Sequence, residues 1–140
     1  MQVKVKKLNK DAIAPSYSLP GDAGLDMHCL KDYTIAPGER CQLQTGIALE
    51  YPPGYTALVW DKSGLSHKHG LHVLGGVFEY TYRGEYIIML LNTSDKEYKF
   101  SKGDKICQLL IQPIESVEIE EVEKLSDSTR ADRGFGSTGK

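Results

Sequence analysis

The stretch HKHGLHVLGGVFEYTYRGEY, residues 67–86, decides how this chain is interpreted. It contains a glycine pair at 75–76, and aromatic residues recur at every second position from Phe78 to Tyr82. This spacing is typical of a β-strand, because successive side chains point to opposite faces. Glycines also allow the backbone to approach a neighbour closely. We therefore predict a β-hairpin that packs against a flat ligand, with the Glu79 carboxylate beside it. An ordinary buried hairpin with a solvent-facing Glu79 would give the same pattern.

Length and composition limit the classes of protein. The 140 residues predict one domain, and 17 basic against 19 acidic side chains leave a net charge of -2, which argues against a nucleic-acid-binding surface. The sequence has no apolar run long enough to span a membrane and no apolar segment near its start that would indicate a secretory signal. Three scattered cysteines without a CxxC pair predict reduced thiols and a cytoplasmic protein rather than a disulfide framework or a zinc site.

The remaining sequence predicts short strands separated by turns rich in Pro and Gly. A short helix is expected only over 63–70. Many short strands with such turns are typical of an all-β sandwich or barrel. The expected strands cover residues 3–5, 23–30, 40–50, 55–60, 86–92, 97–100, 105–114 and 117–122.

The end of the chain differs in composition from the rest. Ser, Asp, Arg and Gly dominate residues 126–140, and Phe135 is the only large apolar side chain there. Such a segment cannot bury enough apolar surface to order itself. We therefore divide the chain into a β-domain over 1–125 and a flexible C-terminal arm over 126–140. Glycines and hydroxyls suit a loop that wraps phosphate oxygens, although a disordered glycine-rich tail has the same composition.

Three further positions carry polar groups where chemistry is possible. The segment Asp61-Lys62-Ser63-Gly64 joins a strand to the short helix, where backbone N–H groups favour an anion, although it also fits an ordinary turn. Gln108 lies in an apolar run and needs a partner, which is either a neighbouring backbone group or a ligand oxygen. Asp26 lies in an apolar strand, so it requires an Arg, a hydroxyl or the water shell of a metal.

Taken in order, these segments resemble the trimeric dUTPase family, the deoxyuridine triphosphate nucleotidohydrolases. The resemblance covers nearly the whole chain, and five motifs in a fixed order are far more specific than any one. It implies an all-β, jelly-roll-like β-barrel and hydrolysis of dUTP to dUMP and pyrophosphate with Mg2+. It also implies a homotrimer in which three subunits build each active site and the C-terminal arm closes over it. The motifs are AGLDM at 23–27, DKSGLSHKHGL at 61–71, GGVFEYTYRGEY at 75–86, KGDKICQLL at 102–110 and RADRGFGSTG at 130–139.

Residue roles follow from the resemblance by position. Glu79 would be the catalytic carboxylate that activates water, and Asp26 would hold water bound to Mg2+. The backbone at 75–82 would bind uracil, Tyr82 would pack on the deoxyribose and exclude a 2'-hydroxyl, and Phe135 would stack on the base. Phosphates would be held by Ser63, by Gln108 and by the arm. The full set of implied substrate-binding residues is Lys62, Ser63, Gly64, Gly76, Val77, Tyr82, Arg83, Gln108, Arg130, Phe135, Gly136, Ser137 and Thr138.

The chain departs from the family pattern at several positions. Glu79 stands where the family has Asp, and a carboxylate displaced by one methylene can cost about 10²-fold in rate. Lys62 stands where Arg is usual and lacks its bidentate fork. Ala131 and Arg133 replace glycines in the arm.

Two other functions therefore remain open. One is a trimeric dUTP-binding or regulatory relative whose hydrolysis is weak or lost through Glu79. The other is a dCTP deaminase of related fold, although those enzymes use a Glu where this chain has Met89.

Overall fold

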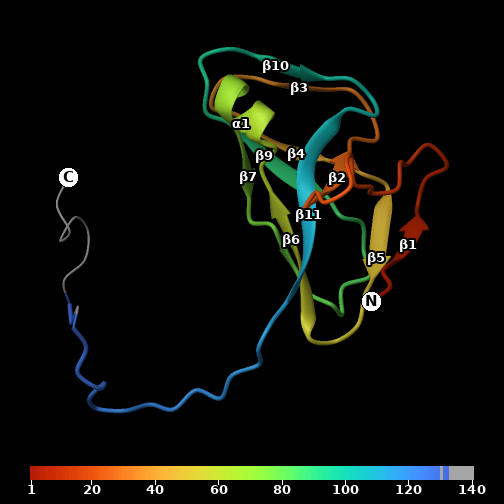
Figure 1. The fold of residues 1–140 in the computed structure, drawn as a ribbon. Coiled ribbons are helices and arrows are strands. Elements are labelled where there is room, and N and C mark those ends of the chain that lie inside the picture. The colour runs from red at the N-terminus through yellow and green to blue at the C-terminus, as the bar shows by residue number, and fades with distance from the viewer. Residues whose placement is uncertain (130, 133–140) are drawn as a thin grey trace.

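A computed structural model describes residues 1–129, 131 and 132. Strands dominate, with one short helix, so the predicted all-β class is confirmed (Figure 1). No helix in the described part of the chain is long and apolar enough to cross a membrane. The elements in order are β1 (Lys4–Lys7), β2 (Leu25–His28), β3 (Tyr33–Ile35), β4 (Arg40–Leu43), β5 (Ile47–Glu50), β6 (Tyr55–Trp60), α1 (Ser63–His69), β7 (Leu71–Leu74), β8 (Val77–Phe78), β9 (Ile88–Asn92), β10 (Tyr98–Phe100) and β11 (Lys105–Pro113).

Antiparallel pairing arranges the strands into two larger sheets and two strand pairs. The larger sheets have the orders β2-β11-β6-β8 and β4-β9-β7, and the pairs are β1-β5 and β10-β3. Most neighbouring strands are distant in sequence, which is expected of a jelly-roll-like fold. Over residues 1–129 this pairing does not close into one barrel.

The core lies where the two larger sheets face each other. Met27, Val59 and Leu109 contribute from one sheet, and Val73 and Leu90 from the other, all almost fully buried. Each such side chain stabilises the fold by about 1.5–3 kcal/mol relative to exposure.

The predicted hairpin within residues 67–86 does not form. β7 pairs with β9 whereas β8 pairs with β6, so the Gly75-Gly76 step carries the chain from one sheet to the other. At Gly76 the φ angle is 99°, and a Cβ atom would lie 2.7 Å from the Val59 carbonyl oxygen. Only glycine fits such an approach. β8 ends at Phe78. The alternating aromatic residues from Phe78 to Tyr82 therefore extend beyond the strand.

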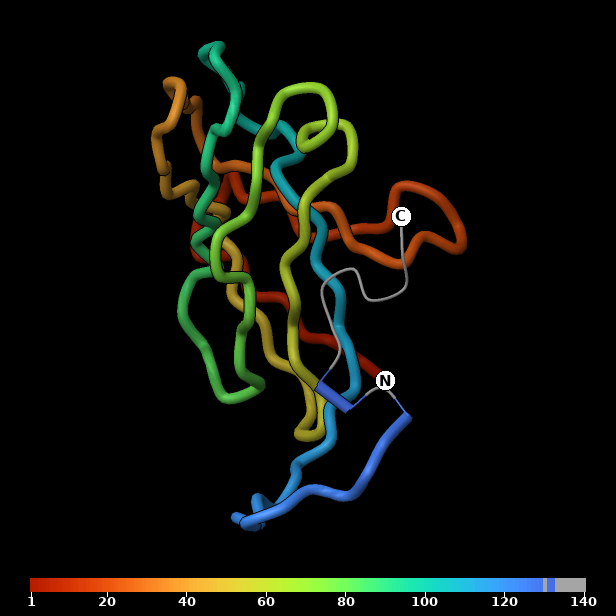
Figure 2. The backbone as a smooth tube through the Cα atoms, turned by 90° about the vertical axis from the view of Figure 1, so that its left-hand side faces the viewer, coloured from red at the N-terminus to blue at the C-terminus, as the bar shows by residue number. Residues whose placement is uncertain are grey.

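Three smaller differences concern strand boundaries. The predicted strand at 40–50 is two strands, separated by a left-handed Gly46. The three-residue β3 was not predicted. Residues 117–122 form no strand, because they leave the end of β11 and run outside the body (Figures 1 and 2). Val117 and Ile119 are accordingly 72% and 87% exposed.

Candidate active site

Asp26 of β2 lies at the centre of a compact charged cluster. Its Oδ1 accepts a hydrogen bond from Lys62 Nζ at 2.5 Å, and its Oδ2 accepts from Lys105 Nζ at 2.7 Å and from Ser18 Oγ at 2.5 Å. The Asp26 residue is only 3% exposed. Ser18 also accepts a bond from Lys105. The sequence identified Asp26 and Lys62 as separate polar positions, and the structure joins them.

The two lysines give this cluster a positive balance. Burial alone would raise the pKa of Asp26, but the hydrogen bonds from Lys105, Lys62 and Ser18 outweigh it and hold that pKa well below its ordinary value. Asp26 is therefore ionised, and two ammonium groups share one carboxylate. The side chains of Lys62 and Lys105 are 27% and 46% exposed, so each can donate further hydrogen bonds to an anion. Sequence reasoning missed Lys105 and Ser18. The pairing of β2 with β11 brings Lys105 to Asp26, and the bridge between Ser16 and Asp26 brings Ser18 there from the loop before β2.

The start of α1 and the middle of β11 border this cluster. Lys62 is the N-cap residue of α1, and no side chain of the described residues caps the helix, so the first-turn N–H groups of Ser63 and Gly64 have no side-chain partner there. Gln108 lies opposite Asp26 on one side and opposite Trp60 on the other. Its Nε2 makes only a long bond, 3.4 Å, to the Asp61 carbonyl.

Gly24 is required by this arrangement. A Cβ atom on Gly24 would lie 2.7 Å from Gln108 Oε1 and 2.9 Å from its Cβ. The predicted first, second and fourth motifs therefore meet in one place within the chain.

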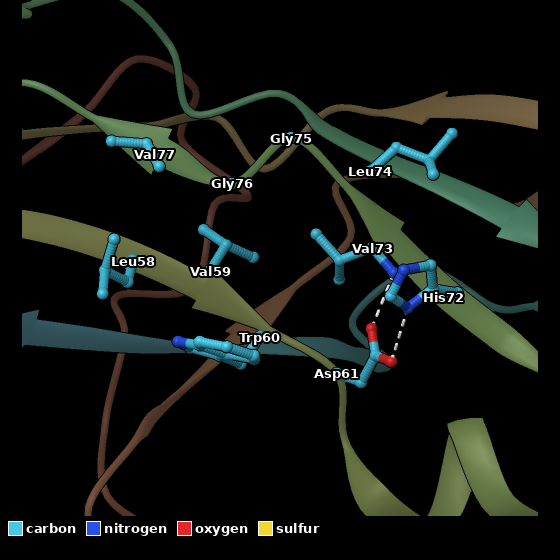
Figure 3. A pocket seen from close by; sticks show the side chains of 10 residues that line it. All are labelled: Leu58, Val59, Trp60, Asp61, His72, Val73, Leu74, Gly75, Gly76 and Val77. Carbon is cyan, nitrogen blue, oxygen red and sulfur yellow. Dashed lines mark hydrogen bonds and ion pairs between the residues drawn. The ribbon is translucent and has the colours of Figure 1, made fainter. Parts of the chain in front are cut away.

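A cavity of about 420 Å³ lies between the C-terminal end of β6 and the β7–β8 connection (Figure 3). At one end the Asp61 carboxylate accepts from the Val73 N–H at 2.6 Å and lies 2.8 Å from His72 Nδ1. The volume of the cavity is within the range of small-molecule sites. Trp60, Asp61 and His72 were not predicted to belong to it, because their segments are joined only by the fold. The lining residues are Leu58, Val59, Trp60, Asp61, His72, Val73, Leu74, Gly75, Gly76 and Val77.

Glu79 follows β8 and begins a tight turn. The N–H of Tyr82 donates to the Glu79 carbonyl at 3.0 Å, and Arg83 Nη1 donates to the carbonyls of Tyr80 and Tyr82. The Glu79 side chain is exposed and makes no hydrogen bond or ion pair with any described residue. Arg83 thus holds the turn, and its Nε lies 3.8 Å from Glu50.

Tyr82 is the aromatic face of this turn. Its ring is tilted against Phe78 and Tyr86 at centroid distances of 5.8 and 6.0 Å, and its hydroxyl donates to the Glu85 carbonyl. The residue is 41% exposed, so one part of the ring remains free for a ligand.

One chain does not bring Glu79 to the charged cluster. β8 and β2 are three strand positions apart in their sheet, and Phe78 lies opposite Ala57 whereas Asp26 lines up with Gln108 and Trp60. With strand spacing of about 4.8 Å and a rise of about 3.3 Å per residue, the Phe78 and Asp26 backbones are roughly 17 Å apart. The charged cluster around Asp26 and the turn that carries Glu79 are the two halves of the candidate site. Within one chain they therefore lie on different regions of the surface.

The fit to a metal ion can be judged from Asp26. The described residues contain no group of three or more His, Cys, Asp or Glu side chains that could hold a metal ion. Direct coordination by Asp26 also conflicts with the two ammonium groups on its oxygens. Oδ1, however, accepts only one hydrogen bond and retains a lone pair. Mg2+ usually keeps several waters and binds substrate phosphates, so a water-mediated contact with Asp26 fits.

Most of the predicted arm residues lie outside the described part of the chain. These are Arg130, Arg133, Phe135, Gly136, Ser137 and Thr138. Ala131 is described, and its φ of 47° is the left-handed conformation that favours glycine.

Fold and geometry together define an all-β protein with a cationic cluster for an anionic ligand and a separate cavity of small-molecule size. The family model described as dUTPase matches residues 10–139, and the chain belongs to the dUTPase family.

Known proteins of this family resemble the chain along its whole length. A deoxyuridine 5'-triphosphate nucleotidohydrolase of Nautilia profundicola is 44% identical over 142 aligned positions, which cover 100% of both chains. The dUTPase of Staphylococcus bacteriophage 80alpha, as a G164S mutant with dUpNHpp, has a TM-score of 0.91 and 29% identity, covering 99% of this chain and 98% of that one. A D95N mutant dUTPase of phage phi11 of S. aureus, in a structure concerned with coordination of a structural Mg(II) ion, has a TM-score of 0.83 and 25% identity, covering 91% and 100%.

Proposed function

We propose that this chain hydrolyses dUTP to dUMP and pyrophosphate, with Glu79 as the carboxylate that activates the attacking water. Family membership supports the overall reaction. The observation that carries the role of Glu79 is its isolation, because an exposed carboxylate without a protein partner is free to accept a proton from water. Glu79 also lies in the same turn as Tyr82, and the Tyr82 ring is suited to packing against the deoxyribose.

The substrate divides naturally between the two parts of the site. Uracil enters beside Gly76 and Val77, where backbone groups bind its edge, and Tyr82 packs on the deoxyribose. The triphosphate lies on Lys62 and Lys105. Ser63, Gly64 and Gln108 add neutral donors to the phosphate oxygens. Arg83, which closes the Glu79 turn, supports binding indirectly. The arm residues Arg130, Phe135, Gly136, Ser137 and Thr138 cover the nucleotide.

The chemistry then depends on positioning and charge. Glu79 takes a proton from water as the water oxygen attacks the α-phosphorus. The bond between the α-phosphorus and the oxygen that bridges it to the β-phosphate breaks, and that oxygen leaves with its electron pair as part of pyrophosphate. Lys62 and Lys105 stabilise the charge that develops on the phosphate oxygens, which is the main contribution proteins make to phosphoryl transfer. When bound, Mg2+ neutralises part of the triphosphate charge. Asp26 would hold one of its waters while keeping both lysines in place.

We further propose a homotrimer, with residues 1–125 as the β-domain and 126–140 as the arm. The separation of roughly 17 Å between the Phe78 and Asp26 backbones supports this assembly, because each chain holds its Glu79 turn away from its own charged cluster. A neighbouring subunit that contributes Glu79 and Tyr82 completes the site.

The test is pyrophosphate release from dUTP with Mg2+, compared with dTTP, dCTP and UTP. We expect release from dUTP alone. Glu79→Gln should lower kcat by at least about 100-fold while the imido analogue dUpNHpp still binds, and the exposed Glu118→Gln serves as a control. Undiminished turnover in Glu79→Gln would overturn the proposed role. Tight dUpNHpp binding without turnover, restored by Glu79→Asp, would instead establish the dUTP-binding relative.

A further inference from the structure

The carbonyl oxygen of Phe78, the residue immediately before Glu79, accepts hydrogen bonds from two side-chain hydroxyls. Tyr51 donates at 2.6 Å and Thr56 at 3.0 Å. Both donors are almost completely buried, at 3% and 5% exposure. Two buried hydroxyls on one carbonyl at the end of a two-residue strand are more than β-pairing requires.

Tyr51 also connects the strands around this carbonyl. Its hydroxyl accepts from the Ala57 N–H at 3.0 Å while it donates to Phe78, and Ala57 is the residue opposite Phe78 in the β6–β8 pair. Tyr51 directly follows β5. One phenol therefore ties β5, β6 and β8 together at the last paired residue before Glu79.

The Phe78 side chain is fixed as well as its carbonyl. Its ring stacks on Tyr86 with a centroid distance of 4.1 Å and an interplanar angle of 15°, and Tyr86 is 0% exposed. The Glu79 carboxylate, in contrast, has no partner among the described residues. Its position within one chain consequently depends on the backbone from which it projects.

We propose that Tyr51 and Thr56 are positioning residues for Glu79, a role that rests on the proposed function of Glu79 as the water-activating carboxylate. The Phe78 carbonyl and the Glu79 N–H belong to one planar peptide unit, so holding the oxygen fixes the Glu79 Cα. Glu has one more rotatable bond than Asp, and its carboxylate therefore samples more space. A firmly held Cα limits that sampling, which matters because a displacement of about 1 Å can cost about 10²-fold in rate.

The first variant is Tyr51→Phe, which keeps the ring and removes only the hydroxyl. We expect kcat for dUTP to fall by about 10- to 100-fold, while KM and the Kd of dUpNHpp change by less than about 2-fold. Thr56→Val removes one donor and leaves the Tyr51 bridge, so a smaller loss of kcat with the same unchanged Kd is expected. Tyr33→Phe is the matched control, because its hydroxyl accepts from the Gln44 N–H, just after β4, and makes no bond to the Phe78 carbonyl.

Measuring the effect of Tyr51→Phe on kcat in both the wild-type and the Glu79→Gln protein separates a positioning role from a general loss of stability. Tyr51→Phe should cause no further loss of kcat there, because the group it positions is already inactive. An equal loss in both backgrounds, or wild-type kcat in both Tyr51→Phe and Thr56→Val, would overturn the positioning role. Full activity of Glu79→Gln would instead remove the proposed function itself. If Tyr51→Phe does not fold, Thr56→Val decides by the same comparison of kcat in the two backgrounds.

Discussion

Replacing Asp26 with Asn tests the central charged cluster most directly. The carboxylate accepts from Lys62 on Oδ1 and from Lys105 and Ser18 on Oδ2, so it uses both oxygens. An amide has only one acceptor oxygen, and its NH2 group must face a donor in either orientation. The change is nearly isosteric, and any effect therefore reports the electrostatics of the cluster.

The magnitude follows from the bonds that are lost. In the less costly orientation the NH2 group faces Lys62, and one hydrogen bond to a charged group disappears, at about 1.5–3 kcal/mol. The bonds from Lys105 and Ser18 remain but lose the negative charge that strengthens them. Water offsets part of the loss at Lys105, which is 46% exposed. We expect Asp26→Asn to lower the free energy of unfolding by about 2–3 kcal/mol at pH 7.

The assay is urea unfolding followed by circular dichroism at one fixed protein concentration, because an oligomer's stability depends on concentration. Asp22→Asn is the control, since Asp22 is exposed and accepts only from the Leu19 N–H. The pKa of Asp26 is lowered on folding, so its stabilisation is complete above the ordinary Asp pKa and fades as pH falls below it. The difference between wild type and Asp26→Asn should therefore shrink from pH 7 to pH 3. An unchanged difference, or one no larger than that of Asp22→Asn, would refute the reasoning.

Three further predictions concern binding, pH and assembly. Lys105→Met should raise KM for dUTP by about 10-fold, because the substrate loses a contact to a charged group. Lys102→Met is the control and should leave KM unchanged, because Lys102 forms an exposed ion pair with Asp11. His28 has a pKa lowered by burial and by nearby lysines, so stability should fall as pH drops below its ordinary pKa of 6.5, and His28→Gln should flatten that fall in thermal melts. We expect Asp26→Asn and Glu79→Gln chains each to release pyrophosphate slowly on their own, and mixing them should restore release, because a shared site then receives an intact Asp26 and an intact Glu79 from different subunits; no recovery would contradict a site shared between subunits.

The sequence determined the class of fold and much of the local structure. Period-two patterning and Pro/Gly turns predicted strands such as 55–60, which β6 reproduces, and the short helix at 63–70. Local signals suffice there because side-chain alternation and turn chemistry act over a few residues. The order of the motifs also predicted the family, which the comparisons confirmed.

Only the tertiary structure decided how those motifs meet. The aromatic alternation at 78–82 indicated a hairpin, but long-range pairing sent β7 and β8 to different sheets. The partners of Asp26 could not be read from its own strand, because Lys62 and Lys105 reach it through strand pairing and the start of a helix. The same holds for Tyr51, whose hydroxyl reaches the Phe78 carbonyl from the end of another strand. Sequence patterning thus specified where most strands and turns lie, whereas the neighbours of each strand depended on non-local packing and hydrogen bonding.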